Sequence, residues 1–165
     1  MKEVKIKFKI KSVNKNDKDW IRNFIVRKWG SEKIIIHGKI FYPSALPGFI
    51  VYKKNNYLGL VTYIIKKNIL EIITIDAVVY RKGIGTVLLK AVEKVARKRK
   101  CKRIRVVTTN DNVDALRFWQ KRGFLIKTVY PNAISLSRKL KPEIPLIGNY
   151  GILVKDEIKL EKFIR

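Results

Sequence analysis

Residues 69–98 have the sequence ILEIITIDAVVYRKGIGTVLLKAVEKVARK, in which the spacing of the apolar side chains changes halfway. The first part, 69–78, is a nearly continuous apolar run whose β-branched content is typical of a strand. From residue 84 onward the apolar side chains recur every three or four positions, which predicts an amphipathic helix over 84–98. Residues 81–86 join the two and contain two glycines, so the sequence predicts a strand, a tight turn and a helix in succession.

The turn at 81–86 has the composition of a loop that approaches a ligand closely. Its glycines let the backbone pass near a ligand, and the following helix N-terminus offers unpaired N–H groups and partial positive charge to a phosphate. Arg81 and Lys82 add cationic donors. The alternative is a tight turn that binds nothing. A P-loop is excluded, because Thr86-Val87 stands where that motif needs Lys followed by Ser or Thr. A Rossmann loop is excluded, because Leu88 stands where that motif needs a third small residue.

A second segment, residues 112–124 with the sequence NVDALRFWQKRGF, follows a further strand expected at 103–109. We expect Asp111 or Asn112 to cap a helix here and Gly123 to close it. Together with the glycine turn, this segment resembles the GNAT superfamily of N-acetyltransferases. Members of that superfamily carry a Gly-X-Gly turn after the fourth strand and an Asn-X-X-Ala…Phe-Tyr…Gly-Phe segment on the next helix.

The resemblance, which covers roughly residues 49–130, implies both a fold and a cosubstrate. The fold is α/β, with a mixed, mostly antiparallel central sheet flanked by helices and splayed between the strands at 69–78 and 103–109. Acetyl-CoA would lie in this gap, with its pantetheine along the end of the first strand and its pyrophosphate on the turn at 81–86. The cofactor-binding residues that the resemblance implies are Asp76, Ala77, Val78, Arg81, Lys82, Gly83, Ile84, Gly85, Thr86, Asn112 and Trp119.

The activity that the resemblance implies is transfer of the acetyl group to a primary amine of a small molecule or protein, by direct attack in a ternary complex. The attacking amine needs a base, and the thioester oxygen needs a hydrogen-bond donor, for which we expect the backbone N–H of Val78. Glu71 is the first candidate for the base and Asp76 the second. Strand alternation places these two on opposite faces unless a bulge intervenes, and Glu71 could instead simply pair with a lysine.

For the acid that would protonate the departing thiolate, the sequence offers several alternatives. The superfamily usually has Tyr where Trp119 stands, and an indole N–H is not a useful acid at neutral pH. Tyr80 or Tyr130 could substitute, solvent could protonate the thiolate, or catalysis is weakened. The acceptor is recognised in the variable half of the superfamily, where His37 lies, and these residues do not indicate which amine it is.

Composition adds a second hypothesis for function. The chain has 165 residues, with 38 Lys and Arg against 13 Asp and Glu, so its net charge is +25. This charge suits either a solvated basic surface or an acidic or nucleic-acid partner. The alternative function is therefore a catalytically weak or RNA-directed binding module on the same fold. A homodimer also stays open.

The remaining composition bounds the kind of protein. The single cysteine, Cys101, forms no internal disulfide and is expected to pack in the interior, and no Cys/His cluster predicts a zinc or other metal site. No apolar run approaches the ~20 residues that a transmembrane helix needs, so we expect a cytoplasmic protein that does not contact a membrane.

We expect one N-acetyltransferase domain over 1–165, with 141–165 as a C-terminal extension packing on it. The other expected strands are at 3–11, 33–37, 49–53, 57–65, 124–130 and near the middle of 152–163, and the other helices run from residue 16 or 17 to 29 and over 133–140.

Overall fold

The computed structural model describes residues 7–165, so the first part of the strand expected at 3–11 lies outside the described residues. The strands are β1 (Lys9–Ser12), β2 (Ile34–Ile36), β3 (Lys39–Phe41), β4 (Gly48–Lys53), β5 (Asn56–Lys66), β6 (Ile69–Ala77), β7 (Arg103–Thr109), β8 (Leu125–Tyr130) and β9 (Glu157–Phe163). The helices are α1 (Lys18–Trp29), α2 (Ile84–Lys98), α3 (Val113–Gln120) and α4 (Ala133–Leu140).

Most of these elements lie where the sequence predicted them, but the β2–β3 hairpin was not expected. Its second strand has only three residues, and its turn is formed by His37 and Gly38, both with positive φ. The His37-Gly38 pair differs from the Asn-Gly and Asp-Gly pairs that mark two-residue hairpin turns most strongly, so the sequence did not signal this turn.

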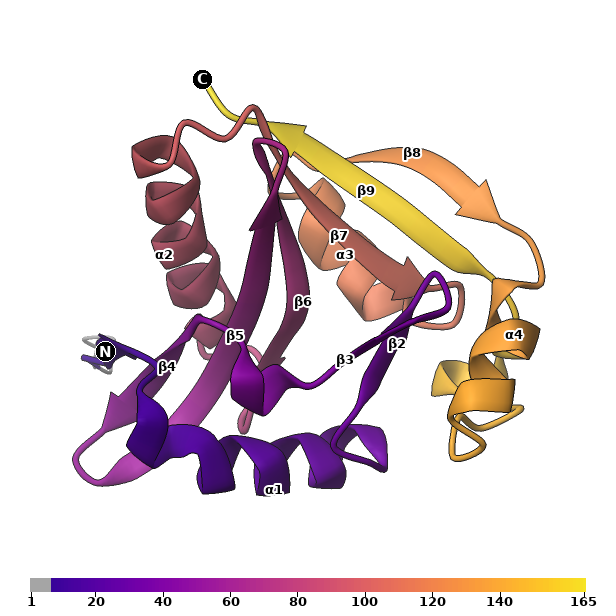
Figure 1. Ribbon diagram of the computed structural model, residues 1–165, viewed down its shortest axis with the longest axis horizontal. Coiled ribbons are helices and arrows are strands. Elements are labelled where there is room, and N and C mark those ends of the chain that lie inside the picture. The colour runs from indigo at the N-terminus through magenta and orange to yellow at the C-terminus, as the bar shows by residue number, and fades with distance from the viewer. Residues whose placement is uncertain (1–6) are drawn as a thin grey trace, which may run out of the picture.

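Seven strands form one sheet in the order β1-β4-β5-β6-β7-β9-β8 (Figure 1). Every neighbouring pair is antiparallel except β6 and β7, which are parallel. This is the mixed, mostly antiparallel α/β arrangement that we predicted. Within the segment 141–165, which we expected to pack on the domain, β9 forms an inner strand of the sheet between β7 and β8.

The sheet splits between β6 and β7. The two strands pair only from Ile69 to Ile72 on β6 and from Arg103 to Val106 on β7, although both strands continue. Beyond Ile72 the facing edges diverge, as the resemblance implied. The divergence coincides with a bulge in β6, because Thr62 of β5 faces Thr74 while the next residue, Tyr63, faces Ile72. Ile73 is therefore the extra residue, and bulges of this kind bend the strand that carries them.

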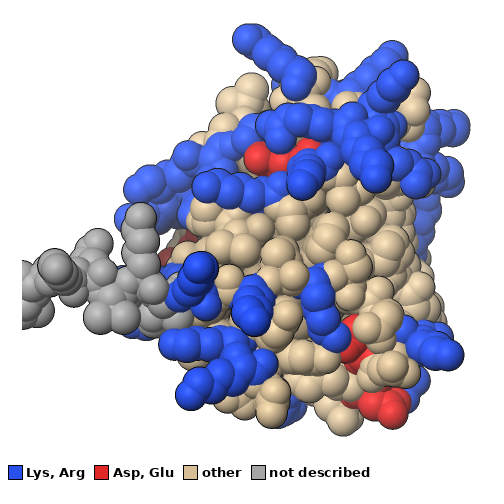
Figure 2. All heavy atoms as spheres, turned by 90° about the vertical axis from the view of Figure 1, so that its left-hand side faces the viewer, with Lys and Arg blue, Asp and Glu red and all other residues tan. Residues whose placement is uncertain are grey.

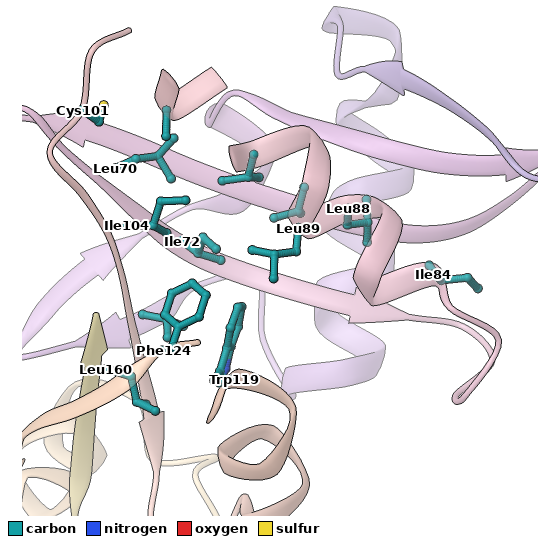
Figure 3. Close-up of a cluster of buried hydrophobic side chains, with 14 of the residues drawn as sticks. Leu70, Ile72, Ile84, Leu88, Leu89, Cys101, Ile104, Trp119, Phe124 and Leu160 are labelled. Atoms are coloured by element: carbon teal, nitrogen blue, oxygen red, sulfur yellow. The ribbon is translucent and has the colours of Figure 1, made fainter. Parts of the chain in front are cut away.

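Helices cover both faces of the sheet, with α1 on one face and α2 and α3 on the other (Figure 1). The larger apolar cluster lies on the α2 and α3 face, where Trp119 and Phe124 point toward Ile72 and Ile104 (Figure 3). Cys101 is buried in this cluster, as predicted, and burial raises the pKa of its thiol. Packing on both faces fixes the positions of β6 and β7, so the split between them is part of a well-anchored sheet.

Candidate active site

The N-terminus of α2 is open to a ligand. No side chain caps this helix, and its first internal hydrogen bond runs from Val87 N to Gly83 O at 3.1 Å. The N–H groups of Ile84, Gly85 and Thr86 therefore have no partner within the helix. Gly83 has φ +79°, and a Cβ added there would meet no atom within 4 Å. The turn consequently presents N–H groups and positive dipole to open space, which is the arrangement that binds anions.

Gly85 has a packing role in the same turn. A Cβ at this position would lie 3.1 Å from the ring of Phe118, so glycine lets the start of α2 approach α3. The guanidinium of Arg122 lies 3.7 Å from the Phe118 ring centroid, and its Nη2 donates to Thr86 Oγ1 at 2.7 Å. Arg122 therefore adds a cation beside the first turn of α2. The sequence reasoning missed it, although it belongs to the segment that carries the resemblance.

The free edge of β6 corrects one prediction. The backbone N–H of Val78 donates to Leu58 O of β5 at 2.8 Å, so it is not free to bind a thioester oxygen, and the predicted role for Val78 is wrong. Backbone groups alternate direction along an extended strand. Since the N–H of Val78 points to β5, those of Ile75 and Ala77 point to the opposite edge, which faces the split. These two N–H groups are the available donors.

The bulge at Ile73 also brings the two candidate bases to one face. Glu71 lies opposite Ile64, and Asp76 lies opposite Leu60. Both of these β5 residues pack in the cluster beneath α1. Because residues directly opposite each other share a face, Glu71 and Asp76 both face α1. Simple alternation would have separated them, and the extra residue removes that separation.

Asp76 lies in an environment that favours its protonated form. Burial against the surrounding protein raises the pKa of its carboxyl to about 6, while the Trp29 hydrogen bond and the charge of Lys28 lower it and partly offset this effect. The indole Nε1 of Trp29 donates to Asp76 Oδ2 at 2.9 Å. The side chain is still partly accessible to solvent. A carboxyl of this kind can accept a proton near neutral pH, which suits a general base.

Glu71 has a different setting. It faces Arg105 in the section where β6 and β7 still pair, and Arg105 itself donates from Nε to Glu161 at 3.0 Å. Within residues 7–165 Glu71 forms no ion pair, so the alternative of a simple lysine pair is not seen there. Glu71 is thus held at the closed end of the split, whereas Asp76 lies on the part of β6 that has left β7.

The motif helix α3 shows packing roles for two predicted cofactor residues. Asn112 caps α3, because its Oδ1 accepts from the N–H of Ala115 at 3.2 Å. The side chain of Trp119 is 2% exposed and packs edge-on against Phe118, with ring centroids 4.9 Å apart. It also packs edge-on against Phe124, at 4.8 Å (Figure 3). The indole therefore fills the core on the face opposite Asp76.

The two tyrosines considered as acids lie in different places. Tyr80 is 68% exposed, and its hydroxyl accepts from Lys28 Nζ at 3.0 Å. Lys28 directly precedes Trp29, which donates to Asp76. Tyr130 instead packs against His37, with ring centroids 4.4 Å apart. Tyr80 therefore borders the open end of β6, and Tyr130 lies at the β2–β3 hairpin.

Segments from the variable half surround the α1 face of the split. The imidazole Nδ1 of His37 lies 2.6 Å from Oε2 of Glu157, a nearly buried carboxylate on β9. This contact ties the β2–β3 hairpin to the sheet. Lys141, after α4, donates from Nζ to Lys33 O at 2.9 Å and ties α4 to the segment before β2. These ties hold the β2–β3 hairpin and α4 in place, and the sequence did not indicate them.

Two features are absent from the part of the chain that the structure describes. Residues 7–165 hold no cluster of three or more His, Cys, Asp or Glu side chains suited to a metal ion. None of the helices in that range combines the length and apolar character that a membrane-spanning helix requires.

Known proteins resemble this chain along most of its length. The sequence model described as "Acetyltransferase (GNAT) family" matches residues 17–124. The uncharacterized protein YdhI of Bacillus subtilis (strain 168) is 42% identical over 152 residues, which span 92% of this chain and 95% of that protein.

Solved structures also share the fold, and two of them are similar over nearly the whole chain. The IAA acetyltransferase from Bacillus cereus ATCC 14579 has a TM-score of 0.71 at 18% identity, over 95% of this chain and 99% of that chain. A GNAT family acetyltransferase from Elizabethkingia anophelis with acetyl-CoA bound has a TM-score of 0.67 at 19% identity, over 94% of this chain and 97% of that chain.

Proposed function

The chain belongs to the GNAT acetyltransferase family, whose cosubstrate is acetyl-CoA, and on that premise we propose that it acetylates a primary amine. The acceptor is a small molecule or a protein amino group, and it attacks acetyl-CoA directly in a ternary complex. The observation that carries this proposal is the free edge of β6, which leads along the split directly to the uncapped N-terminus of α2.

The residues along this path fit acetyl-CoA. The amide groups of the pantetheine arm can pair with the N–H groups of Ile75 and Ala77, as a further strand would. The pyrophosphate can accept from the N–H groups at the start of α2, beside the cations of Arg81, Lys82 and Arg122. The open space at Gly83 leaves room for it.

The acetyl transfer then follows from the groups at the α1 face of the split. The amine nitrogen forms a bond to the thioester carbonyl carbon, and the N–H of Ile75 or Ala77 donates to the carbonyl oxygen as negative charge develops there. Asp76 accepts the proton that the amine loses. The carbon–sulfur bond breaks, and the CoA thiolate leaves and takes a proton from Tyr80 or from solvent.

The structure leads us to propose Asp76 ahead of Glu71 as the base, which reverses the order suggested by the sequence. Asp76 lies next to the two free N–H groups on the part of β6 that borders the split, and its raised pKa suits proton transfer near neutral pH. Glu71 lies in the paired part of the strand and could act only through water.

A panel of amines tests the proposed reaction. The enzyme and acetyl-CoA are incubated with small primary amines or with peptides that offer an α-amino group or a lysine, and free thiol is measured against a reaction without acceptor. We expect one amine class to release thiol well above the background rate and to yield an amide resistant to hydroxylamine. Thiol release that yields only a hydroxylamine-labile ester would contradict N-acetylation.

A further inference from the structure

A basic groove lies at the end of the molecule where α2 ends. Its cationic side chains are Arg97, Lys100, Lys102 and Arg165, and Cys101 and Ile164 complete its lining. The hollow between them has a volume of about 370 Å³. Figure 2 shows Lys and Arg gathered over this upper end of the molecule, with few acidic atoms among them.

Backbone hydrogen bonds hold the groove together. Lys102 N donates to Asn68 O in the β5–β6 turn at 2.8 Å, and Ile164 N donates to Lys102 O at 3.0 Å. The turn therefore brings two further exposed cations, Lys66 and Lys67, to the same end of the molecule. Three segments far apart in the sequence thus converge on one positive surface.

The charge of this surface is not neutralised within residues 7–165. None of the four cations of the basic groove forms an ion pair there, and the acids Glu93 and Glu161 are already paired with other basic residues. A favourable interaction with the C-terminal end of the α2 dipole accounts for Arg97, but not for Lys102 or Arg165. Unpaired like charges at close quarters repel one another, and a polyanion would relieve that repulsion.

The basic groove is separate from the proposed cofactor site. Helix α2 has 15 residues, so at 1.5 Å per residue its two ends are about 22 Å apart. The phosphates of acetyl-CoA are assigned to the N-terminal end, and the basic groove lies at the other end. Acetyl-CoA therefore does not explain these charges.

An exposed aromatic side chain lies at the same end of the molecule, next in sequence to Ile164 of the groove but on the other face of the sheet. Phe163, on β9, is 59% exposed and faces Arg103 across the strand pair, and Lys127 Nζ lies 5.7 Å from its ring centroid. Cations that follow a backbone and exposed rings on which bases stack are the two features of single-strand binding sites. A strictly electrostatic duplex site would need no exposed ring.

We propose that the basic groove binds the phosphate backbone of a single-stranded nucleic acid, with Phe163 stacking on a base where the strand passes around the end of β9. This activity goes beyond acetyl transfer and does not depend on it. The bound strand would lie across the end of α2, the residue before β7 and the end of β9.

Two variants with the same net charge test the location. The groove variant carries Arg97→Gln, Lys100→Gln, Lys102→Gln and Arg165→Gln. The matched control carries Lys15→Gln, Lys18→Gln, Arg27→Gln and Lys53→Gln, all exposed and at the opposite end of the molecule (Figure 1). Fluorescence anisotropy with labelled single-stranded RNA and DNA oligonucleotides is measured over a range of salt concentrations for both variants and the unchanged protein.

We expect the groove variant to lose about tenfold or more in affinity. The slope of log K against log salt should fall by about 3, since each phosphate contact contributes about 0.7 for a single strand. The control should keep nearly the full slope. Equal losses in the two variants would overturn the proposal, because they would show that binding follows net charge alone.

Phe163→Ala separates stacking from charge. It should weaken single-strand binding by about tenfold while leaving the salt slope unchanged, because stacking contributes without counterion release. Tighter binding of a duplex, a poly-glutamate peptide or an anionic vesicle than of the single strands, at the same salt, would overturn the assignment. The groove variant should bind acetyl-CoA normally, so failure here is distinguishable from failure of the acetyltransferase assignment.

Discussion

Replacing Gly83 with Glu should reduce the affinity for acetyl-CoA by about 100-fold or more, which corresponds to about 2.7 kcal/mol of binding free energy. Gly83 precedes the free N–H groups of α2, and a side chain added at this position would enter the open space where the pyrophosphate is expected. A glutamate carboxylate there would occupy the anion site and repel the phosphates. Isothermal titration calorimetry with acetyl-CoA measures the loss.

The matched control for this variant is Gly83→Asn. Gly83 has φ +79°, a conformation that strains most side chains and that Asn tolerates better than others. Asn is neutral, so it tests the backbone strain and the bulk without the negative charge. We expect its affinity for acetyl-CoA to stay within about fivefold of the unchanged protein. Similar affinities for Gly83→Glu and the unchanged protein would contradict the placement of the pyrophosphate.

Asp76→Asn should lower kcat by about 100-fold, because it removes the group proposed to accept the proton of the amine. The affinity for acetyl-CoA should change little, since the proposed contacts of the cosubstrate with β6 are made by backbone groups. Glu71→Gln is the comparison, and we expect it to lower kcat by no more than about threefold. Steady-state kinetics with the acceptor found in the amine panel distinguish the two, and the reverse order of effects would assign the base to Glu71.

The pH dependence gives a second readout for Asp76. A base acts when deprotonated, so kcat should rise with pH through the pKa of Asp76, which is about 6. Trp29→Phe removes a hydrogen bond that lowers this pKa, so the rising limb should move to higher pH. An unmoved limb in Trp29→Phe would show that a different group controls it.

Stability measurements show whether loss of activity in Asp76→Asn comes from misfolding. The pKa of Asp76 is raised by folding from 3.8 to about 6, so the folded state binds the proton more tightly than the unfolded chain. The free energy of unfolding therefore falls as pH rises through this range. Asn does not ionise and so avoids that loss. At pH ~8 we expect the Asp76→Asn variant to be more stable than the unchanged protein by about 1 kcal/mol, less than the full pKa difference would give, because Asp76 is partly exposed to solvent.

The sequence predicted the parts of the site that depend on local residue chemistry. Gly83 and Gly85 marked the turn between strand and helix, and Asn112 marked the start of α3. These features follow from backbone conformation and capping, which single residues report directly. The sheet class was what the resemblance carried by these motifs implied.

The sequence could not predict features set by strand pairing. Both faces of β6 are covered, so Ile72 and Ile73 are both apolar and the bulge at Ile73 left no break in the hydrophobic pattern. The direction of the Val78 N–H depends on register with β5, which residue type does not encode. Strand β9 was hard to place because it buries Glu157 and Glu161, whose carboxylates find their partners His37, Arg103 and Arg105 only in the folded sheet.

A crystal structure with acetyl-CoA bound tests the central claim most directly. We predict that the thioester arm lies between β6 and β7, with its carbonyl oxygen within about 3 Å of the N–H of Ile75 or Ala77, and that the pyrophosphate contacts the N–H groups of Ile84, Gly85 and Thr86. A structure in which the cosubstrate binds elsewhere, while the two strands stay closed around protein side chains, would contradict the account.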